Sequence, residues 1–167
     1  MNFYKGDMVM HWSHGIGQIV NLEERALAGS KTIYYVVQMQ DMTVWVPADS
    51  KVGSRLRPPT PKSRFQRELA ILSSPSEPLP ADRVERKTHL LALLQDGSPE
   101  SLCQIIRDLS AYHKQLGKPM NDNDQMVLRQ ARNTLLGEWG FVLDLTPAQA
   151  EHEMYRLLTS ASLEPEK

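Results

Sequence analysis

The chain has 167 residues, of which 41% are hydrophobic and 23% charged, a composition typical of a soluble globular protein. No apolar run approaches the roughly 18 to 20 residues of a membrane span, and the N-terminus lacks the apolar core of a signal peptide, so a cytoplasmic protein without membrane association is expected. The net charge of −1 excludes a chain that is basic throughout, so any contact with DNA must come from a local patch. The single cysteine, Cys103, cannot form an internal disulfide and is expected to be buried.

Residues 3–57 have the composition of a small β-sheet, with β-branched valines interleaved with aromatic residues. Turn residues separate four or five short strands: Gly6-Asp7, Gly15 and Gly17, Ala28-Gly29-Ser30, and Gln40-Asp41. Short strands joined by tight turns predict an antiparallel sheet that curls into a small barrel, because curling removes exposed edges.

The strand that ends at Pro47 alternates with a period of two. Thr43 and Trp45 should therefore share one face, and Val44 and Val46 the other. Proline cannot donate to a ladder, so it marks a strand end or an edge. A tryptophan in this strand is either a core residue or an exposed anchor for a protein partner, and both interpretations remain open here.

The proline-rich residues 58–61 predict a stiff linker, after which the pattern becomes helical. The first helix, residues 62–73, carries one apolar stripe: Phe65, Leu69 and Leu72. A second proline-rich break at residues 74–80 precedes a helix that Asp82 caps and that ends near Leu94.

Three more helices are predicted, and together they complete a compact all-α bundle over residues 62–160. Ser98 and Pro99 start one that ends at Gly117. Asn121 caps the next, which is expected to end near Gly137 or Gly140 and to direct five residues toward the core: Met126, Leu128, Ala131, Leu135 and Leu136. The last begins at Thr146-Pro147 and runs to about Ser160, and residues 161–167 are expected to form a frayed tail.

The sequence offers little support for catalysis. Five histidines are present, but only His11 and His14 are close together, and no spacing typical of a metal site occurs. Phosphate-binding loops and nucleophile elbows are missing, and Gly15-Ile16-Gly17 fits a hairpin corner better. We expect no catalytic residue, metal site or cofactor, and a metal-dependent enzyme that uses the two histidines is the weakest hypothesis.

Basic residues gather at two places in the predicted helices. Arg83, Arg86 and Lys87 lie near the start of one helix, where Arg83 and Arg86 are three apart and should share a face. Arg129 and Arg132 form a similar pair. Such residues either belong to a solvated helix face or contact backbone phosphates, which gives affinity without sequence specificity.

Several segments, in this order, resemble the CarD/CdnL family of bacterial transcription regulators, over the chain to about residue 158: Phe3 to His11, His14 to Ile19, Thr43-Val44-Trp45-Val46-Pro47, Ile106-Arg107-Asp108-Leu109, Ala131-Arg132 and Leu136-Gly137-Glu138. The resemblance implies that residues 1–57 form a Tudor-like (SH3-like) barrel that docks on the β-subunit lobe of RNA polymerase. It further implies that the helical domain reaches promoter DNA at the upstream edge of the melted region, and that the protein stabilises the open complex and is not an enzyme.

The same resemblance assigns site residues. Arg25 aligns with an arginine that contacts the polymerase lobe, and the strand that contains Thr43, Trp45 and Pro47 aligns with the polymerase-facing strand. Trp45 stands where some family members carry an arginine, which favours an outward-facing, apolar anchor.

In the helical domain, Arg83 stands where bubble-stabilising members wedge a tryptophan into the minor groove. Glu85, Thr88 and Gln125 fall where basic DNA contacts are common, whereas Arg86 keeps its charge. The predicted DNA-contact residues are Arg83, Arg86, Lys87, Arg129 and Arg132.

Two functional hypotheses follow for a protein that is expected to be a monomer. In the first, the chain is a transcription regulator that binds RNA polymerase through its β module and touches promoter DNA weakly through its helices. In the second, it is an adaptor that docks on polymerase and recruits another protein through its helical domain, without binding DNA.

Overall fold

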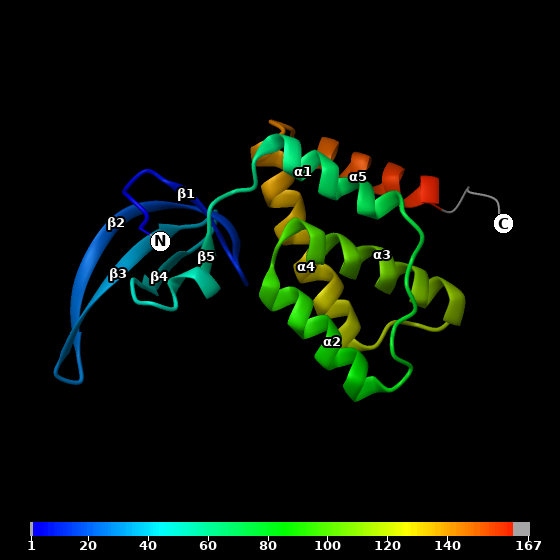
Figure 1. The fold of residues 1–167 in the computed structure, drawn as a ribbon, viewed down its shortest axis with the longest axis horizontal. Coiled ribbons are helices and arrows are strands. Elements are labelled where there is room, and N and C mark those ends of the chain that lie inside the picture. Colours follow the sequence, from blue (N-terminus) through cyan, green and yellow to red (C-terminus); the bar gives the residue numbers. More distant parts are fainter. Residues whose placement is uncertain (1, 162–167) are drawn as a thin grey trace. The chain divides into compact units, whose positions relative to one another are not determined.

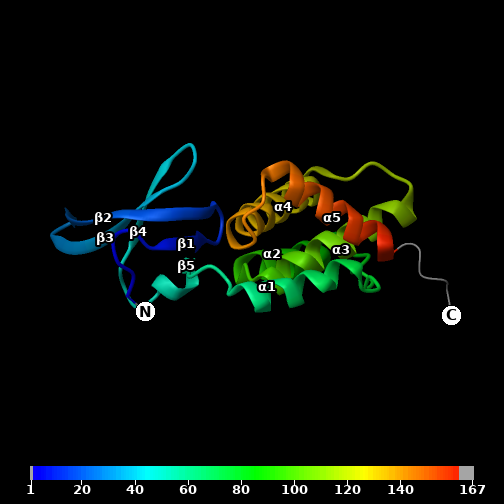
Figure 2. The same cartoon turned by 90° about the horizontal axis from the view of Figure 1, so that it is seen from above.

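The computed structural model describes residues 2–161, and its contacts divide the chain between Pro59 and Thr60. The part before this division is called the β unit and the part after it the helical unit; their elements are labelled in Figures 1 and 2. The division falls inside the expected linker at residues 58–61. The frayed tail expected from residue 161 lies outside the described residues except for Ala161, which is the last residue of a helix.

The β unit is an antiparallel sheet with the strand order β4-β3-β2-β1-β5. Its elements are β1 (Met8–His11), β2 (Gly15–Leu27), β3 (Ser30–Gln38), β4 (Thr43–Pro47), a 3-10 helix (Val52–Ser54) and β5 (Leu56–Arg57). Figure 1 shows β2 and β3 as long, curved, paired strands. Among the described residues no ladder joins β4 to β5, so the module is a barrel-like but open sheet. The predicted fold class, an antiparallel β module followed by helices, is confirmed.

The hairpin between β2 and β3 turns over two residues only. Leu27 pairs with Ser30, and the residues between them, Ala28 and Gly29, have φ values of 52° and 82°. A two-residue turn with positive φ at both positions matches the right-handed twist of the flanking strands. This turn therefore sets the register of the longest pairing in the sheet.

Gly17 was expected at a hairpin corner, but it lies inside β2, opposite Val9. A Cβ atom at this position would lie 2.5 Å from Met39 Sδ and 2.8 Å from Val37 Cγ1, so the glycine is required by close packing. Gly15 is the turn residue of the two, with φ 81° at the start of β2. The core over which the sheet curls includes Val9, Val37 and, from β4, Val46.

The helical unit contains α1 (Lys62–Leu69), a 3-10 turn (Ala70–Ser73), α2 (Arg83–Asp96), α3 (Pro99–Leu116), α4 (Asp122–Val142) and α5 (Pro147–Ala161). The predicted N-caps of α2, α3 and α4 are confirmed, because the side chains of Asp82, Ser98 and Asn121 each accept a hydrogen bond from a backbone N–H in the first turn. Gly97 and Gly117 end α2 and α3 in the left-handed conformation.

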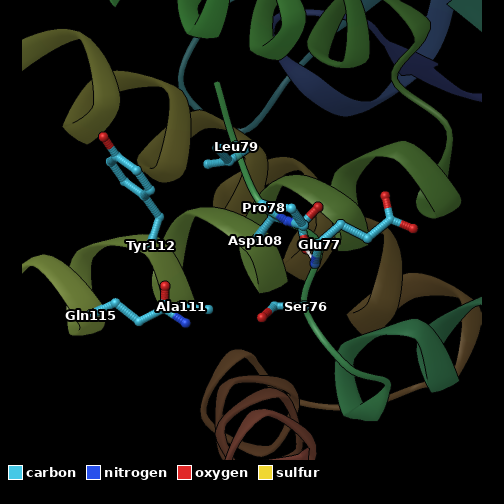
Figure 3. Close-up of a pocket in the computed structure, with 8 residues that line it drawn as sticks. All are labelled: Ser76, Glu77, Pro78, Leu79, Asp108, Ala111, Tyr112 and Gln115. Carbon is cyan, nitrogen blue, oxygen red and sulfur yellow. Dashed lines mark hydrogen bonds between the residues drawn. The ribbon is translucent and has the colours of Figure 1, made fainter. Parts of the chain in front are cut away.

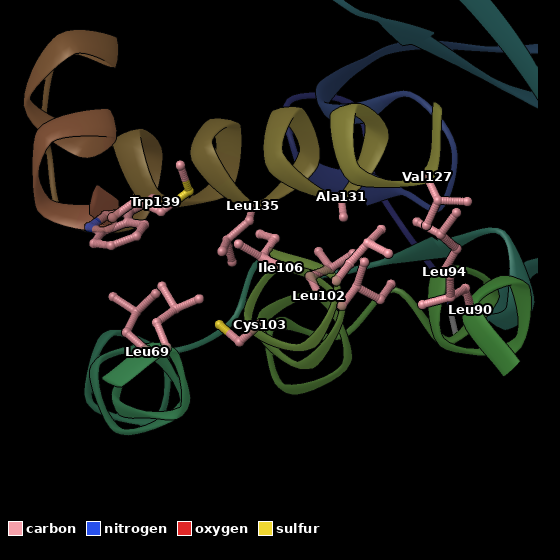
Figure 4. Close-up of a cluster of buried hydrophobic side chains, with 14 of the residues drawn as sticks. Leu69, Leu90, Leu94, Leu102, Cys103, Ile106, Val127, Ala131, Leu135 and Trp139 are labelled. Atoms are coloured by element: carbon pink, nitrogen blue, oxygen red, sulfur yellow. The ribbon is translucent and has the colours of Figure 1, made fainter. Parts of the chain in front are cut away.

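The core of the helical unit forms where α4 packs on α3 and α2. Figure 4 shows Val127, Ala131 and Leu135 directed from α4 toward these helices, with Trp139 lying near Leu69 of α1. The buried side chains at this seam include Leu90, Leu94, Leu102, Ile106 and, as expected, Cys103. Burial raises the pKa of the Cys103 thiol, which therefore stays protonated at neutral pH.

One of the core residues predicted for α4 was wrong. Met126 is 49% exposed, and its neighbour Val127 takes the core position, because the buried stripe continues through Ala131 and Leu135 at four-residue intervals. The helix ends at Val142, two residues after Gly140, which confirms the predicted end near that glycine. Gly140 permits the next segment to fold back, since a Cβ there would lie 3.0 Å from the carbonyl oxygen of Leu145.

The second half of the expected linker belongs to the helical unit. Thr60 is buried, and its backbone N–H and its hydroxyl both donate to Glu138 Oε2, at 2.9 and 3.0 Å. Glu138 is itself fully buried in α4, and Pro61 is the N-cap of α1. The chain is therefore fixed to the helical unit from Thr60 onward.

Arg86 was expected to share an exposed face with Arg83, but it is buried, with 5% of its surface exposed. Its Nε lies 3.4 Å from Asp124 Oδ2 at the start of α4, and its Nη1 donates to the carbonyl oxygen of Pro80 and to the hydroxyl of Tyr112, each at 3.2 Å. The guanidinium also stacks on the Tyr112 ring. Arg86 thus joins α2, α3 and α4, because this position of α2 faces the neighbouring helices.

Gly17→Ala tests the close packing in β2. The added methyl group should destabilise the β unit by about 1–3 kcal/mol, since Met39 and Val37 would have to move. Hydrogen–deuterium exchange of the β1–β3 amides would report the loss of protection. Gly53→Ala is the control, because nothing lies within 4 Å of a Cβ there; equal protection in both variants would contradict the packing argument.

Arg86→Ala should destabilise the helical unit by about 3–5 kcal/mol, because it removes the guanidinium that pairs with the buried Asp124 carboxylate. Urea denaturation followed by circular dichroism would measure the change. Arg83→Ala removes the same charge from an exposed position on the same helix and should change stability by less than about 0.5 kcal/mol. A similar loss of stability in both variants would mean that the effect of Arg86 on stability does not come from its burial against Asp124.

Candidate functional site

The predicted polymerase-binding residues lie on one face of the sheet. Residues that pair directly across strands point to the same side, as do alternate residues within a strand. The observed pairs are Arg25 with Thr32, Glu23 with Tyr34 and Pro47, Asn21 with Val36 and Trp45, and Gln38 with Thr43. These residues form what is called here the outer face, and Val37 and Val46 point to the opposite side, into the core.

A β-bulge puts the β2 residues on this face. Ile19 pairs with Val37 and is buried, and the register then shifts so that Asn21, not Val20, pairs with Val36. The shift inverts the alternation along β2. Without it, Glu23 and Arg25 would point to the same side as Ile19.

Trp45 is the centre of an exposed cluster on the outer face. It is 40% exposed, which decides between the core and exposed interpretations of this tryptophan. Its Nε1–H donates to Glu23 Oε2 at 3.0 Å, and the guanidinium carbon of Arg25 lies 4.8 Å from the centroid of its ring. Arg25 also donates to Glu23 Oε2, through Nε at 3.3 Å and Nη2 at 3.2 Å. The structure thus brings Arg25 and Trp45 into direct contact.

Glu23 belongs to this cluster but was not among the predicted site residues. The two-residue spacing between Glu23 and Arg25 could have indicated a shared face in a strand. Their proximity to Trp45 depends on the bulge and on strand pairing, neither of which is visible in local sequence.

Thr43 and Pro47 lie on the same strand as Trp45, two residues before and two after it. Thr43 Oγ1 donates to Gln38 Oε1 at 2.8 Å, and Gln38 Nε2 donates in turn to the carbonyl oxygens of Met39 and Met42. Thr43 is therefore tied to the β3–β4 turn. Pro47 ends β4, one of the two edge strands of the sheet, where its missing N–H interrupts no ladder between inner strands.

The structure separates the predicted DNA-contact residues into two groups. Arg83, Lys87 and Arg129 are exposed. Arg83 and Lys87 are four residues apart in α2 and therefore share a helix face; Val84, which lies between them in sequence, is 71% exposed.

Arg86 and Arg132 form the second group, in which the cation is engaged within the helical unit. Arg86 is buried against Asp124, as described above. Arg132 stacks on Tyr155 of α5, donates to its hydroxyl, and lies 3.5 Å from Glu151. Three of the five predicted residues are thus exposed at the surface, whereas Arg86 and Arg132 form contacts between helices.

Among residues 2–161, no group of three or more His, Cys, Asp or Glu side chains could hold a metal ion, and none of the helices is both long and apolar enough to cross a bilayer. His11 and His14 have ring centroids 4.8 Å apart, and His11 Nδ1 accepts from the backbone of Ser13 and of His14. Burial, followed by the charge of His14, lowers the pKa of His11 to about 4, which keeps its ring neutral at pH 7.

A small cavity of about 130 Å³ lies in the helical unit between residues 76–79 and α3 (Figure 3). Its polar wall includes Asp108, whose Oδ1 accepts from the backbone N–H of Glu77 at 2.9 Å. Arg107 donates to the same carboxylate and to Ser74 Oγ. These bonds tie the proline-rich segment to α3, so Asp108 has a structural role in the wall of the cavity.

Comparisons with known proteins agree with a division of the chain into a β unit and a helical unit. A family model for the CarD-like/TRCF RID domain matches residues 3–58, and one for the CarD C-terminal domain matches residues 67–155. A Bacillus subtilis (strain 168) protein described as "Putative transcription factor YdeB" is 25% identical over 149 residues, which cover 88% of this chain and 96% of that protein. The two domain matches occur in the order of the β unit and the helical unit, and the chain therefore belongs to the CarD family of transcription regulators.

Proposed function

We propose that the chain regulates transcription by docking its outer face on the β-subunit lobe of bacterial RNA polymerase. The observation that carries this proposal is the exposed cluster of Trp45, Arg25 and Glu23. Tryptophan and arginine are enriched among the residues that dominate binding energy, because each buries a large surface and also offers hydrogen-bond donors.

The helical unit supplies the second contact in this proposal. Arg83, Lys87 and Arg129 reach backbone phosphates of promoter DNA, which gives weak affinity without sequence specificity. The protein then stabilises the open complex only to the extent that it binds the open promoter better than the closed one. A difference on the order of 1–3 kcal/mol would change the open fraction several-fold or more.

An adaptor without DNA contact is the second candidate, and the state of two arginines favours it. Arg86 and Arg132 are engaged inside the helical unit, which leaves a smaller cationic surface than the sequence suggested. In this version the helical unit recruits another protein, and promoter DNA adds nothing to the affinity for polymerase.

Trp45→Ala should weaken binding of the full chain to a purified β-lobe fragment by roughly 30-fold, or about 2 kcal/mol, since it removes the central apolar anchor. Isothermal titration calorimetry would measure the affinity, and an unchanged unfolding midpoint would show that the sheet is intact. Ile33→Ala is the matched control: Ile33 is also exposed and lies on β3, but it points away from the outer face. Wild-type affinity for Trp45→Ala would contradict docking through this face.

A combined Arg83→Ala, Lys87→Ala and Arg129→Ala variant separates the two candidate functions. With DNA contact, it should bind holoenzyme on a forked promoter more weakly than wild type, and the slope of log affinity against log salt should fall by up to about three. Its affinity for the lobe fragment should not change.

The control for this triple variant removes three exposed cations elsewhere in the helical unit: Lys62, Arg67 and Lys118. It should bind the promoter complex like the wild type. If the triple variant also does so, or if the fork adds no affinity to the wild-type chain, the adaptor function is supported instead.

A further inference from the structure

One carboxylate oxygen holds both side chains on which the proposed docking face relies. Glu23 Oε2 accepts from Trp45 Nε1 at 3.0 Å and from Arg25 Nη2 at 3.2 Å, while Arg25 stacks on the Trp45 ring. The three side chains therefore close a ring of contacts that spans β2 and β4. The backbone beneath this ring is fixed by the ladder through β3.

The contribution of these three side-chain contacts to the free energy of folding should be small. The side chains of Arg25 and Glu23 are 49% and 36% exposed, and ion pairs at such exposure are worth little because water screens them. The contacts should matter more for the orientation of the Trp45 side chain. An exposed indole without a partner samples several rotamers, and a binding partner must then immobilise it at an entropic cost.

We propose that Glu23 is a positioning residue of the docking face. It fixes the edge of Trp45 through the Nε1 hydrogen bond and holds Arg25 on one side of the ring, so that the indole meets polymerase in a single orientation. This inference rests on the proposed function. Glu23 acts through Trp45 and Arg25 and makes no contact with polymerase itself.

The acceptor and the charge of Glu23 can be separated by substitution. In Glu23→Gln the side-chain carbonyl still accepts from Trp45 Nε1, although the ion pair with Arg25 is lost. Glu23→Ala removes both. Glu24→Ala is the matched control, since Glu24 is the next residue of β2, points to the opposite side, and pairs with Lys31 at 3.8 Å.

The experiment measures binding of the full chain to the β-lobe fragment at moderate salt. Glu23→Ala should bind roughly tenfold more weakly than wild type. Glu23→Gln should stay within about threefold, and Glu24→Ala likewise. In a Trp45→Ala background, Glu23→Ala should cost less affinity than in the wild type, because only its contact with Arg25 is left to lose.

A spectroscopic readout follows the orientation directly. The indole N–H signal of Trp45 in a nitrogen–proton correlation spectrum, assigned by its loss in Trp45→Ala, should move in Glu23→Ala and stay near its wild-type position in Glu23→Gln and Glu24→Ala. A purely structural role of Glu23 would not produce this pattern together with an unchanged unfolding midpoint.

Three results would overturn the positioning role while leaving polymerase docking intact: wild-type affinity in Glu23→Ala when Trp45→Ala binds weakly, an equal loss for Glu23→Ala in the Trp45→Ala background, or an indole signal that Glu23→Ala leaves unmoved. Wild-type affinity in Trp45→Ala itself would instead overturn the docking face, so the two failures are distinguishable.

Discussion

The register between β2 and β3 determines which side chains of the β unit point to solvent and which point into its core. A two-residue turn at Ala28 and Gly29 sets this pairing at one end, and the bulge after Ile19 inverts the alternation toward the other. A slip by one residue would exchange the faces of every side chain in the strand. The bulge keeps Ile19 in the core and also turns the acidic and basic residues that follow it outward. The one extra residue of the bulge thus allows β2 to direct Ile19 into the core and Glu23 and Arg25 to the surface.

Arginine is used in the same way at three places in the described structure. Arg25, Arg86 and Arg132 each stack on an aromatic ring, and each also meets a carboxylate from another position in the chain. A planar guanidinium suits this double contact, because its faces stack while its edge donates hydrogen bonds. The consequence is electrostatic: the charge of each of these three cations is compensated by a carboxylate nearby.

Local signals were sufficient to predict most of the fold. The caps Ser98 and Asn121 and the change from strand to helix patterns placed the elements correctly, since capping and periodicity act within a few residues. The candidate site was harder to predict from the sequence. The place of Arg25 on the outer face depends on a bulge without a sequence signature. The burial of Arg86 depends on Asp124, which lies two helices further along the chain. Long-range partners and the phase of a strand are decided by tertiary packing, which the local pattern does not contain.

The bond between Thr60 and Glu138 has a consequence for how this architecture can be recombined. Because Thr60 supplies two donors to a carboxylate buried inside α4, the helical unit includes a residue that the sequence assigns to the linker. A gene fusion that joined a different N-terminal module at residue 62 would delete those donors and disturb the interior of the bundle. A joint between Pro58 and Pro59 would preserve them. The natural boundary for exchanging modules, in evolution or in engineering, is therefore set by a buried acid and not by the prolines alone.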